Sequence, residues 1–406
     1  MVEVYSHGQY AQYIVFSNSV ISSNIATSGF GGGIYFNNYA SFISLSNTII
    51  TNNTASAHGG SGGGVAVSIA SHVGFTNVTV DSNYAQFGGG VAFTSGASNV
   101  VMDVVTFTNN AASSGGGICF LNFCSNIAIT NATIAYNSAS GNGGGMYVNS
   151  LIGLSVSYSA IQHNHALYGG GVMFLTAVSD AIFSFCNFSN NYATEGGAIN
   201  LLALNNNVGF EYVNIHNHSV HSSGGGVVVG NYNSGVYFYH CVLLRNTAVS
   251  NTGGAVKLGD SNSEIGFYYC VFISNVAGID GGGISCLSDN SVVTVEHSTF
   301  YNNIAGTDGG GISILSDNSE VTVEPSIFHY NIAGTDGGGM SYLSGNCYVS
   351  VEYCSFDYNT AASGGTISLM KSNRNGHLTN LQVTYNIVKS FSGGLYLGDS
   401  NVNFTF

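Results

Sequence analysis

The sequence predicts an all-β protein: a single-stranded, right-handed parallel β-helix, or solenoid, of about 14 rungs with about 28 residues in each rung. Three observations predict it. A Gly-Gly-x-apolar signature recurs fourteen times, an Asn precedes each signature by seven to eleven residues, and the intervening segments alternate apolar and polar residues. Short strands separated by turns at a fixed period are typical of stacked coils.

The glycine signature gives the period. Its third position falls at Gly33, Gly64, Gly90, Gly117, Gly145, Gly171, Ala198, Gly226, Ala255, Gly283, Gly311, Gly339, Thr366 and Leu395. Glycine permits a positive φ or a close approach of two backbones, so we interpret the signature as structural. Because the repeats cover nearly the whole chain without capping repeats, we expect one continuous β-helix domain over residues 1–406, as a segment of a longer chain.

The second signature is an asparagine with an apolar residue three positions before it. The asparagines are Asn24, Asn53, Asn83, Asn110, Asn137, Asn164, Asn191, Asn217, Asn246, Asn275, Asn303, Asn331, Asn359 and Asn386. Asn217 is the exception, because Asn214 stands where the other repeats have an apolar residue. Asparagine tolerates the left-handed region, and stacked amides bond to one another, so we predict an Asn ladder at a bend.

Within each repeat the apolar residues recur with the period of a strand. Val321, Val323, Ser326 and Phe328 form an apolar or small set, with polar residues between them. Stacked rungs bring equivalent residues together, so we expect an interior aromatic column of Phe272, Phe300, Phe328 and Phe356. The repeats at 275–302 and 303–330 agree at 20 of 28 positions, which indicates one geometry for both.

A second interior column is predicted five residues before the asparagines, where small residues recur. Its members are Ser159, Cys186, Cys241, Cys270, Ser298, Ser326 and Cys354. Free cysteine packs as a small apolar residue, so packing is favoured over catalysis. Cys241 and Cys270 fall on adjacent rungs, where a disulfide stays an alternative with restrictive geometry.

The charge balance excludes several classes of function. Lys and Arg number 5 against 19 Asp and Glu, which gives a formal net charge of −14, so the chain lacks the cations that bind nucleic acid. No apolar run reaches the about 18 residues of a membrane-spanning helix, so we expect no transmembrane segment. Residues 1–15 lack the basic and apolar regions of a signal peptide.

The paired motif, Phe-x-x-Asn followed by Gly-Gly-Gly-Ile or Gly-Gly-Ala-Ile, resembles the repeats of the chlamydial polymorphic outer membrane proteins. It occurs at Phe107–Asn110 with Gly115–Ile118, at Phe188–Asn191 with Gly196–Ile199, and at Phe300–Asn303 with Gly309–Ile312. The resemblance implies the β-helical passenger of an autotransporter, exposed at the cell surface or extracellular, that adheres to host cells. The sequence departs from that family in having no visible signal segment and no room for a translocating barrel after its repeats.

β-Helices also host polysaccharide enzymes, so the sequence can be tested against the residues that such catalysis requires. A lyase needs a base with acidic neighbours, and the nearest set is Lys257 with Asp260 and Glu264. A hydrolase needs two paired carboxylates, and the sequence shows no Asp-Asp pair. His163 and His165 flank Asn164, but too far from the next such pair for zinc. We therefore predict no catalytic, cofactor-binding or metal-binding residue.

Acidic residues recur at two corners of the predicted coil. Asp280, Asp308 and Asp336 fall 28 residues apart, and Glu296, Glu324 and Glu352 do likewise. Stacked carboxylates repel one another unless they are solvated or bridged by a cation. A weak calcium-binding edge is one interpretation of Asp280, Asp308 and Asp336, and a solvated column is the favoured one, because Ca²⁺ takes six to eight oxygens in one place.

The leading functional hypothesis is a non-enzymatic cell-surface or secreted scaffold of the adhesin type. A solenoid with polar faces presents an extended surface, which suits a host-cell, protein or glycan partner. Open solenoid ends also expose strand edges, so self-association end to end or edge to edge is expected. The alternative is a carbohydrate-active β-helix enzyme, either a polysaccharide lyase or a glycoside hydrolase.

Overall fold

The chain folds as a parallel β-solenoid of about 14 turns with about 28 residues per turn, as predicted. The computed structural model describes all residues except 1, 5–10, 28, 38 and 57–58, and none of the described residues is helical. Hence no described segment is a helix that could cross a membrane. The chain divides into two compact units, Met1–Ala193 and Thr194–Phe406. A single continuous domain stays a prediction.

Three strand positions recur in each turn of the first unit. The first position holds β1 (Val2–Val4), β5 (Ile34–Phe36), β8 (Val65–Ser68), β10 (Val91–Ser95), β13 (Ile118–Phe120), β17 (Met146–Val148) and β20 (Val172–Phe174). The second holds β2 (Gln12–Ser17), β3 (Val20–Ser22), β6 (Ser41–Thr51), β9 (Ser71–Asp81), β11 (Ser98–Thr108), β14 (Cys124–Thr130), β15 (Thr133–Ala135), β18 (Leu151–Ser157), β19 (Ala160–Gln162), β21 (Ser179–Ser184) and β22 (Asn187–Ser189). The third holds β4 (Ile25–Ala26), β7 (Thr54–Ala55), β12 (Ala111–Ser114), β16 (Ser138–Asn142) and β23 (Tyr192–Ala193).

The second unit repeats this order. Its first position holds β24 (Ile199–Ala203), β28 (Val227–Asn231), β32 (Val256–Leu258), β36 (Ile284–Cys286), β40 (Ile312–Ser316), β44 (Met340–Ser344), β48 (Ile367–Lys371) and β52 (Leu395–Leu397). The second holds β25 (Asn206–Glu211), β26 (Asn214–His216), β29 (Ser234–Tyr239), β30 (Val242–Leu244), β33 (Ser263–Tyr268), β34 (Val271–Ile273), β37 (Val292–Glu296), β38 (Thr299–Tyr301), β41 (Glu320–Glu324), β42 (Ile327–His329), β45 (Val349–Glu352), β46 (Ser355–Asp357), β49 (Arg374–Thr379), β50 (Gln382–Thr384) and β53 (Val402–Thr405). The third holds β27 (Ser219–Val220), β31 (Thr247–Ala248), β35 (Val276–Ala277), β39 (Ile304–Ala305), β43 (Ile332–Ala333), β47 (Thr360–Ala361) and β51 (Ile387–Val388).

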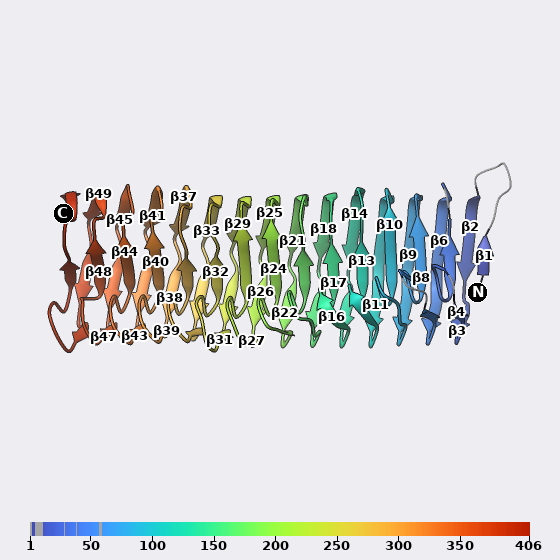
Figure 1. Cartoon of the computed structure of the whole chain (residues 1–406), viewed down its shortest axis with the longest axis horizontal. Helices are drawn as coiled ribbons and strands as arrows, with labels where there is room; N and C mark the ends of the chain where they lie inside the picture. The colour runs from blue at the N-terminus through green and yellow to red at the C-terminus, as the bar shows by residue number, and fades with distance from the viewer. Residues whose placement is uncertain (1, 5–10, 28, 38, 57–58) are drawn as a thin grey trace. The chain divides into compact units, whose positions relative to one another are not determined.

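The strands of the first and second positions pair in parallel with the equivalent strands of the next turn, so like residues meet like. In the second unit β38 pairs with β42 with Phe300 opposite Phe328, and β42 pairs with β46 with Phe328 opposite Phe356. Figure 1 shows strands of successive turns lying side by side within each unit. In this register, the side chain at each position of the repeat lies in line with the equivalent side chains of the neighbouring turns.

The predicted phenylalanine column is confirmed in the interior of the second unit. The rings of Phe272, Phe300, Phe328 and Phe356 stack with centroid separations of 4.5, 4.7 and 4.6 Å and interplanar angles of 2–6°. All four side chains are buried. In repeat eleven, Val321, Val323 and Ser326 are buried as well, as the period of two predicts. A second interior stack, which the sequence did not indicate, consists of Phe210, Phe238 and Phe267.

Backbone geometry and the phenylalanine column together explain the glycine signature. Gly309, the first glycine of its signature, has a φ of 66°, which favours glycine. A Cβ on Gly310 would clash with the carbonyl oxygen of Gly338 in the next turn. A Cβ on Gly311 would lie 2.8 Å from the ring of Phe328. Phe-x-x-Asn and Gly-Gly-Gly therefore form one packing unit, in which the ring lies against the third glycine of the preceding turn.

The predicted asparagine ladder is confirmed in both units. In the second unit the side-chain nitrogen of Asn303 donates to Asn331 Oδ1 at 3.0 Å and to the carbonyl oxygen of Phe272 at 3.0 Å. The backbone N–H of Asn303 also donates to Asn331 Oδ1. In the first unit the same contacts run through Asn53, Asn83, Asn110, Asn137, Asn164 and Asn191. Each amide thus satisfies backbone groups that the bend leaves unpaired.

The assignment of Asn217 to the ladder is wrong. His218 occupies that position, buried, and its backbone N–H donates to Asn246 Oδ1 at 3.2 Å. Asn217 is exposed with a φ of 58°, and Ile215, paired with Leu243, is the buried residue three positions before His218. The apparent exception at Asn214 arose because an adjacent asparagine shifted the alignment by one residue.

A second asparagine ladder lies at another corner of the second unit, and the sequence analysis did not find it. Its members are Asn205, Asn233, Asn262, Asn290, Asn318, Asn346, Asn373 and Asn401. The equivalent corner of the first unit is apolar and holds Ala40, Ala70, Ala97, Cys124, Leu151 and Val178, all buried. The two units therefore share one fold but close this corner with different chemistry.

The predicted small column is also confirmed, and its cysteines are thiols. Cys241 and Cys270 are both free, so the alternative of a disulfide between them is wrong for this structure. Burial raises the pKa of Cys186 to about 11, and its thiol donates to the carbonyl oxygen of Ser184. Burial likewise raises the pKa of Cys354 to about 12. Protonated, buried thiols are poor nucleophiles, which agrees with a packing role.

Candidate binding surface

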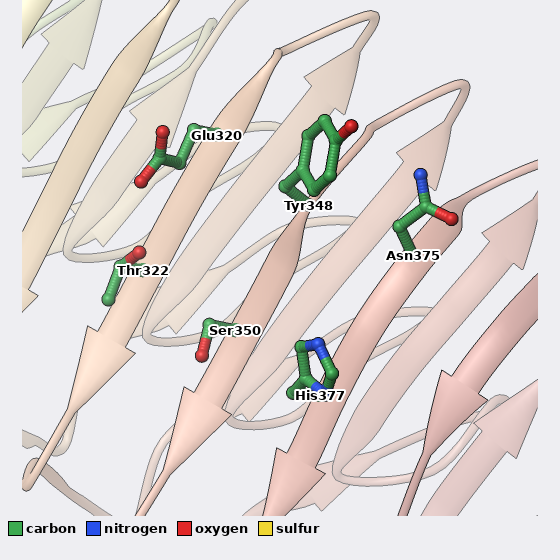
Figure 2. A pocket seen from close by; sticks show the side chains of 6 residues that line it. All are labelled: Glu320, Thr322, Tyr348, Ser350, Asn375 and His377. Atoms are coloured by element: carbon green, nitrogen blue, oxygen red, sulfur yellow. The ribbon is translucent and has the colours of Figure 1, made fainter.

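A recess on the outer face of the second unit is a candidate site. It has a volume of about 290 Å³ and is lined by Glu320, Thr322, Tyr348, Ser350, Asn375 and His377. Figure 2 shows these side chains in two rows that cross three successive turns. β41, β45 and β49 supply five of them and Tyr348 immediately precedes β45, with Thr322 opposite Ser350 and Ser350 opposite His377 in the parallel register. The site is thus assembled from residues that the sequence keeps about 28 positions apart.

The chemistry of the recess is polar with one aromatic ring. Glu320, Tyr348 and His377 are exposed. Ser350 Oγ donates to Glu352 Oε1 at 3.2 Å, and Asn403 Nδ2 donates to Asn375 Oδ1 at 3.1 Å. Of the six described residues that line the recess, Glu320 is the one carboxylate. Such a surface can offer donors, acceptors and a ring face to an uncharged polar ligand.

The first unit has a recess of its own, with a volume of about 410 Å³. It is lined by Gln12, Tyr39, Ala40, Ser41, Ile69, Ala70, Ser71, Gly96 and Ser98. None of these lining residues carries a charged side chain, and small residues dominate. This recess offers few groups that could orient a ligand, so it is a weaker candidate than the recess around Tyr348.

An exposed file of aromatic rings runs along another edge of the second unit. Tyr212, His240, Tyr269 and His297 stack in order, with centroid separations of 5.0, 4.9 and 4.8 Å and interplanar angles of 6–13°. Each inner ring has a neighbour on both faces, so only ring edges meet the solvent. Stacked pairs of this kind stabilise a fold by about 0.5–1.5 kcal/mol each. We interpret the file as structural.

The aspartate column that the sequence predicted is formed, and its members hold the backbone of the next turn. The backbone N–H of Asp308 donates to Asp280 Oδ1 at 3.1 Å, and that of Asp336 donates to Asp308 Oδ1 at 3.0 Å. Burial, together with the neighbouring carboxylates of Asp280 and Asp336, raises the pKa of Asp308 to about 6. Burial also raises the pKa values of Asp280 and Asp336. The column is partly desolvated, which the solvated interpretation did not anticipate.

Asp308→Asn is expected to remove a pH dependence of stability. Because the pKa of Asp308 in the fold lies above its ordinary value of 3.8, its stabilising contribution is complete below about pH 4 and is lost as pH rises through about 6. After allowance for solvent screening, we expect the variant to be more stable by about 1 kcal/mol at neutral pH and unchanged at about pH 4. Asn keeps an oxygen that can accept from Asp336.

Urea unfolding of both proteins at the two pH values measures this difference. Asp289→Asn is the matched control, because Asp289 is exposed and lies in the same unit. An equal gain from Asp289→Asn, or a loss of stability at neutral pH in Asp308→Asn, would contradict the assignment.

The other acidic and basic candidates are not brought into a catalytic group. Lys257 lies in β32 and Glu264 in β33, whereas Asp260 lies in the turn between these strands. Asp260 Oδ1 accepts the backbone N–H of Ser288 at 3.0 Å. The glutamates form the predicted file, with Glu296 opposite Glu324 on the outer face. No group of three or more His, Cys, Asp or Glu is placed to hold a metal ion among the described residues, so the calcium-binding interpretation gains no support.

The histidine pair of the first unit takes part in ring stacking. His163 stacks on Tyr136 at 4.9 Å, and His165 stacks on Tyr192 at 5.1 Å. The residues that sequence reasoning missed are those around Tyr348. The sequence offers little indication of this site. The equivalent position in successive turns is occupied by Val292, Glu320, Tyr348 and Asn375, which share no residue type.

Residues 297–315 match the model of the Chlamydia polymorphic membrane protein repeat. No curated protein matches the chain. The tailspike protein of Pseudomonas phage LKA1 is 12% identical, with a TM-score of 0.35, and the similarity covers 86% of this chain and 51% of that one. The catalytic unit of a thermostable α-1,3-glucanase from Streptomyces thermodiastaticus is 11% identical, with a TM-score of 0.27, and 97% and 64% of the chains are covered.

At these TM-scores the two structures do not bear on function. The family match is more specific, because residues 297–315 contain Phe300, Asn303 and Gly309–Gly311, which form the core and the turn of one coil. An apolar residue, a ladder asparagine and a glycine signature recur at the equivalent positions of most other turns in both units. The second unit therefore contains a repeat of the polymorphic membrane protein type.

Proposed function

We propose that the chain is a non-enzymatic, adhesin-like scaffold, displayed at a cell surface or secreted, that presents a polar surface to a host-cell, protein or glycan partner. The observation that carries the proposal is the recess around Tyr348, where side chains of three turns form one uncharged, hydrogen-bonding surface apart from Glu320. The repeat matched at residues 297–315 supports a surface location by its family.

The distribution of charge also supports this proposal. With 5 Lys and Arg and a net charge of −14, the chain has little attraction for nucleic acid or for anionic membrane surfaces. Exposed tyrosines are numerous: Tyr232, Tyr348 and Tyr353 are each more than 60% exposed. Tyrosine supplies contact area and a hydroxyl at low entropic cost, which is why binding surfaces are rich in it.

The test is direct binding of the full 406-residue chain. The fluorescently labelled chain is incubated with cultured epithelial cells and with an array of neutral and acidic glycans. The expected result is saturable binding that excess unlabelled chain displaces and that the heat-unfolded chain does not reproduce. Failure to bind any cell surface or glycan would contradict the proposal.

A carbohydrate-active enzyme is the alternative, and one observation favours it. Ser350, which lines the recess, hydrogen-bonds Glu352, so a second carboxylate lies at the margin of this surface, at the strand end opposite to Glu320. Two carboxylates are the minimum for a glycoside hydrolase. Release of reducing ends from a polysaccharide panel by the wild-type chain, abolished in Glu320→Gln and Glu352→Gln, would establish the enzyme and overturn the scaffold.

A further inference from the structure

The ring of Tyr348 differs from the stacked tyrosines of the same unit. Its side chain is 62% exposed. None of the ring contacts found among the described residues involves Tyr348, whereas Tyr269 lies between His240 and His297. Its neighbours along the file are Glu320 and Asn375, which are small enough to leave a ring face accessible. Tyr348 is therefore free to stack on a ligand ring.

The groups around that ring match a ligand with several hydroxyl groups. Glu320 offers carboxylate oxygens that only accept hydrogen bonds. Asn375 already accepts from Asn403 through Oδ1, so its amide nitrogen is presented as a donor. The hydroxyl of Ser350 donates a hydrogen bond to Glu352, so the Ser350 oxygen is presented as an acceptor. Two acceptors and a donor thus lie near an aromatic ring, and sugar hydroxyl groups can both donate to and accept from such groups.

The charge and the volume of the recess restrict the class of ligand further. Glu320 in the recess and Glu352 beside it repel anionic sugars. The volume of about 290 Å³ lies just below the usual range of ligand sites, about 300 to 1,000 Å³, so the recess suits a ligand as small as one sugar ring or two. A pyranose has an apolar face that stacks on an aromatic ring and hydroxyls at its rim.

We propose that the recess binds the ring of a neutral pyranose, which stacks on Tyr348 while Glu320, Asn375 and His377 bond its hydroxyls. This inference rests on the proposed function, since it names the ligand class and the site of the adhesin surface. The ligand spans three turns, so the site exists only in the folded solenoid (Figure 2).

The probes are the methyl pyranosides of glucose, galactose, mannose and N-acetylglucosamine, titrated into the full chain and followed by saturation-transfer NMR. We expect one of them to bind with a dissociation constant of about 1 mM, because a single sugar ring has few atoms to bury. Tyr348→Asn, whose new residue tolerates the φ of 47°, should weaken binding at least about tenfold. Tyr348→Phe should bind within about twofold of the wild type, because stacking is retained.

Tyr232→Asn is the matched control, because Tyr232 is also 62% exposed, lies in the same unit and has a φ of 58°. It should bind like the wild type. If no pyranoside binds, or if Tyr348→Asn binds as the wild type does, the inference is overturned; continued attachment of the chain to cells would then leave the proposed function standing. Pyranoside binding through Tyr348 without any attachment to cells would instead support the site and contradict the adhesin role.

Discussion

Asn303→Ala is expected to lower the free energy of unfolding by about 4 kcal/mol. The substitution removes four side-chain hydrogen bonds, two donated by Asn303 Nδ2 and two accepted by its Oδ1 from Asn275. It leaves the backbone N–H of Asn275 buried without its acceptor and removes one donor from the carbonyl oxygen of Phe272. Each such group costs about 1–3 kcal/mol because water cannot replace the lost bond.

Asn303→Asp tests the contribution of hydrogen bonding to stability at nearly constant side-chain volume. It keeps the shape and the accepting oxygen but sets a carboxylate against Asn331 Oδ1 in a buried site, so a loss of similar size is expected at neutral pH. Asn302→Gly is the control, because Asn302 has a φ of 54° and donates one side-chain bond, to Ser274. Urea unfolding followed by circular dichroism measures all three. Equal losses for Asn303→Ala and Asn302→Gly would refute the ladder as a source of stability.

Phe300→Ala is expected to destabilise the second unit by about 4 kcal/mol. Phe300 is buried between Phe272 at 4.5 Å and Phe328 at 4.7 Å, and it also packs against the backbone of Gly283. Removing the ring leaves a cavity that the rigid turns above and below cannot fill, so the loss of apolar contact adds to the loss of stacking. Phe300→Leu should cost about 1–2 kcal/mol, because it retains most of the volume.

Tyr301→Ala provides the comparison within the same strand. Tyr301 is the next residue of β38, but its side chain is 42% exposed, so its removal should cost about 1 kcal/mol or less. Thermal and urea unfolding of the three variants rank them. An unfolding midpoint of Phe300→Ala equal to that of Tyr301→Ala would show that the interior file contributes no more than the surface does.

Much of the fold could be predicted because each turn repeats a few geometrically constrained residues. Phe300, Asn303 and Gly310 each meet a copy of themselves in the next turn, so their spacing reveals the coil directly. The error at Asn217 has a simple cause. A histidine replaced the ladder asparagine, and the exposed turn residue beside it happened to be asparagine.

The second ladder and the recess were harder to predict. Asn290, Asn318 and Asn346 recur at the right spacing, but the same corner holds Ala70, Cys124 or Leu151 in the first unit, so the signal is diluted over the whole chain. The recess depends on which unlike side chains the register places together. Glu320, Tyr348 and Asn375 are neighbours only because of parallel pairing across turns, and no periodic pattern marks them.

The second asparagine ladder, which lies at one corner of the second unit, constrains how such a chain can gain turns. A turn inserted among Asn290, Asn318 and Asn346 must contain its own asparagine at this corner, because the side-chain amide of each asparagine donates a hydrogen bond to the asparagine of the next turn. A duplicated neighbour meets this condition automatically, whereas a turn taken from the unit whose corner is apolar would interrupt it. Residues 275–302 and 303–330, which agree at 20 of 28 positions, are the kind of tandem gene duplication that this rule admits.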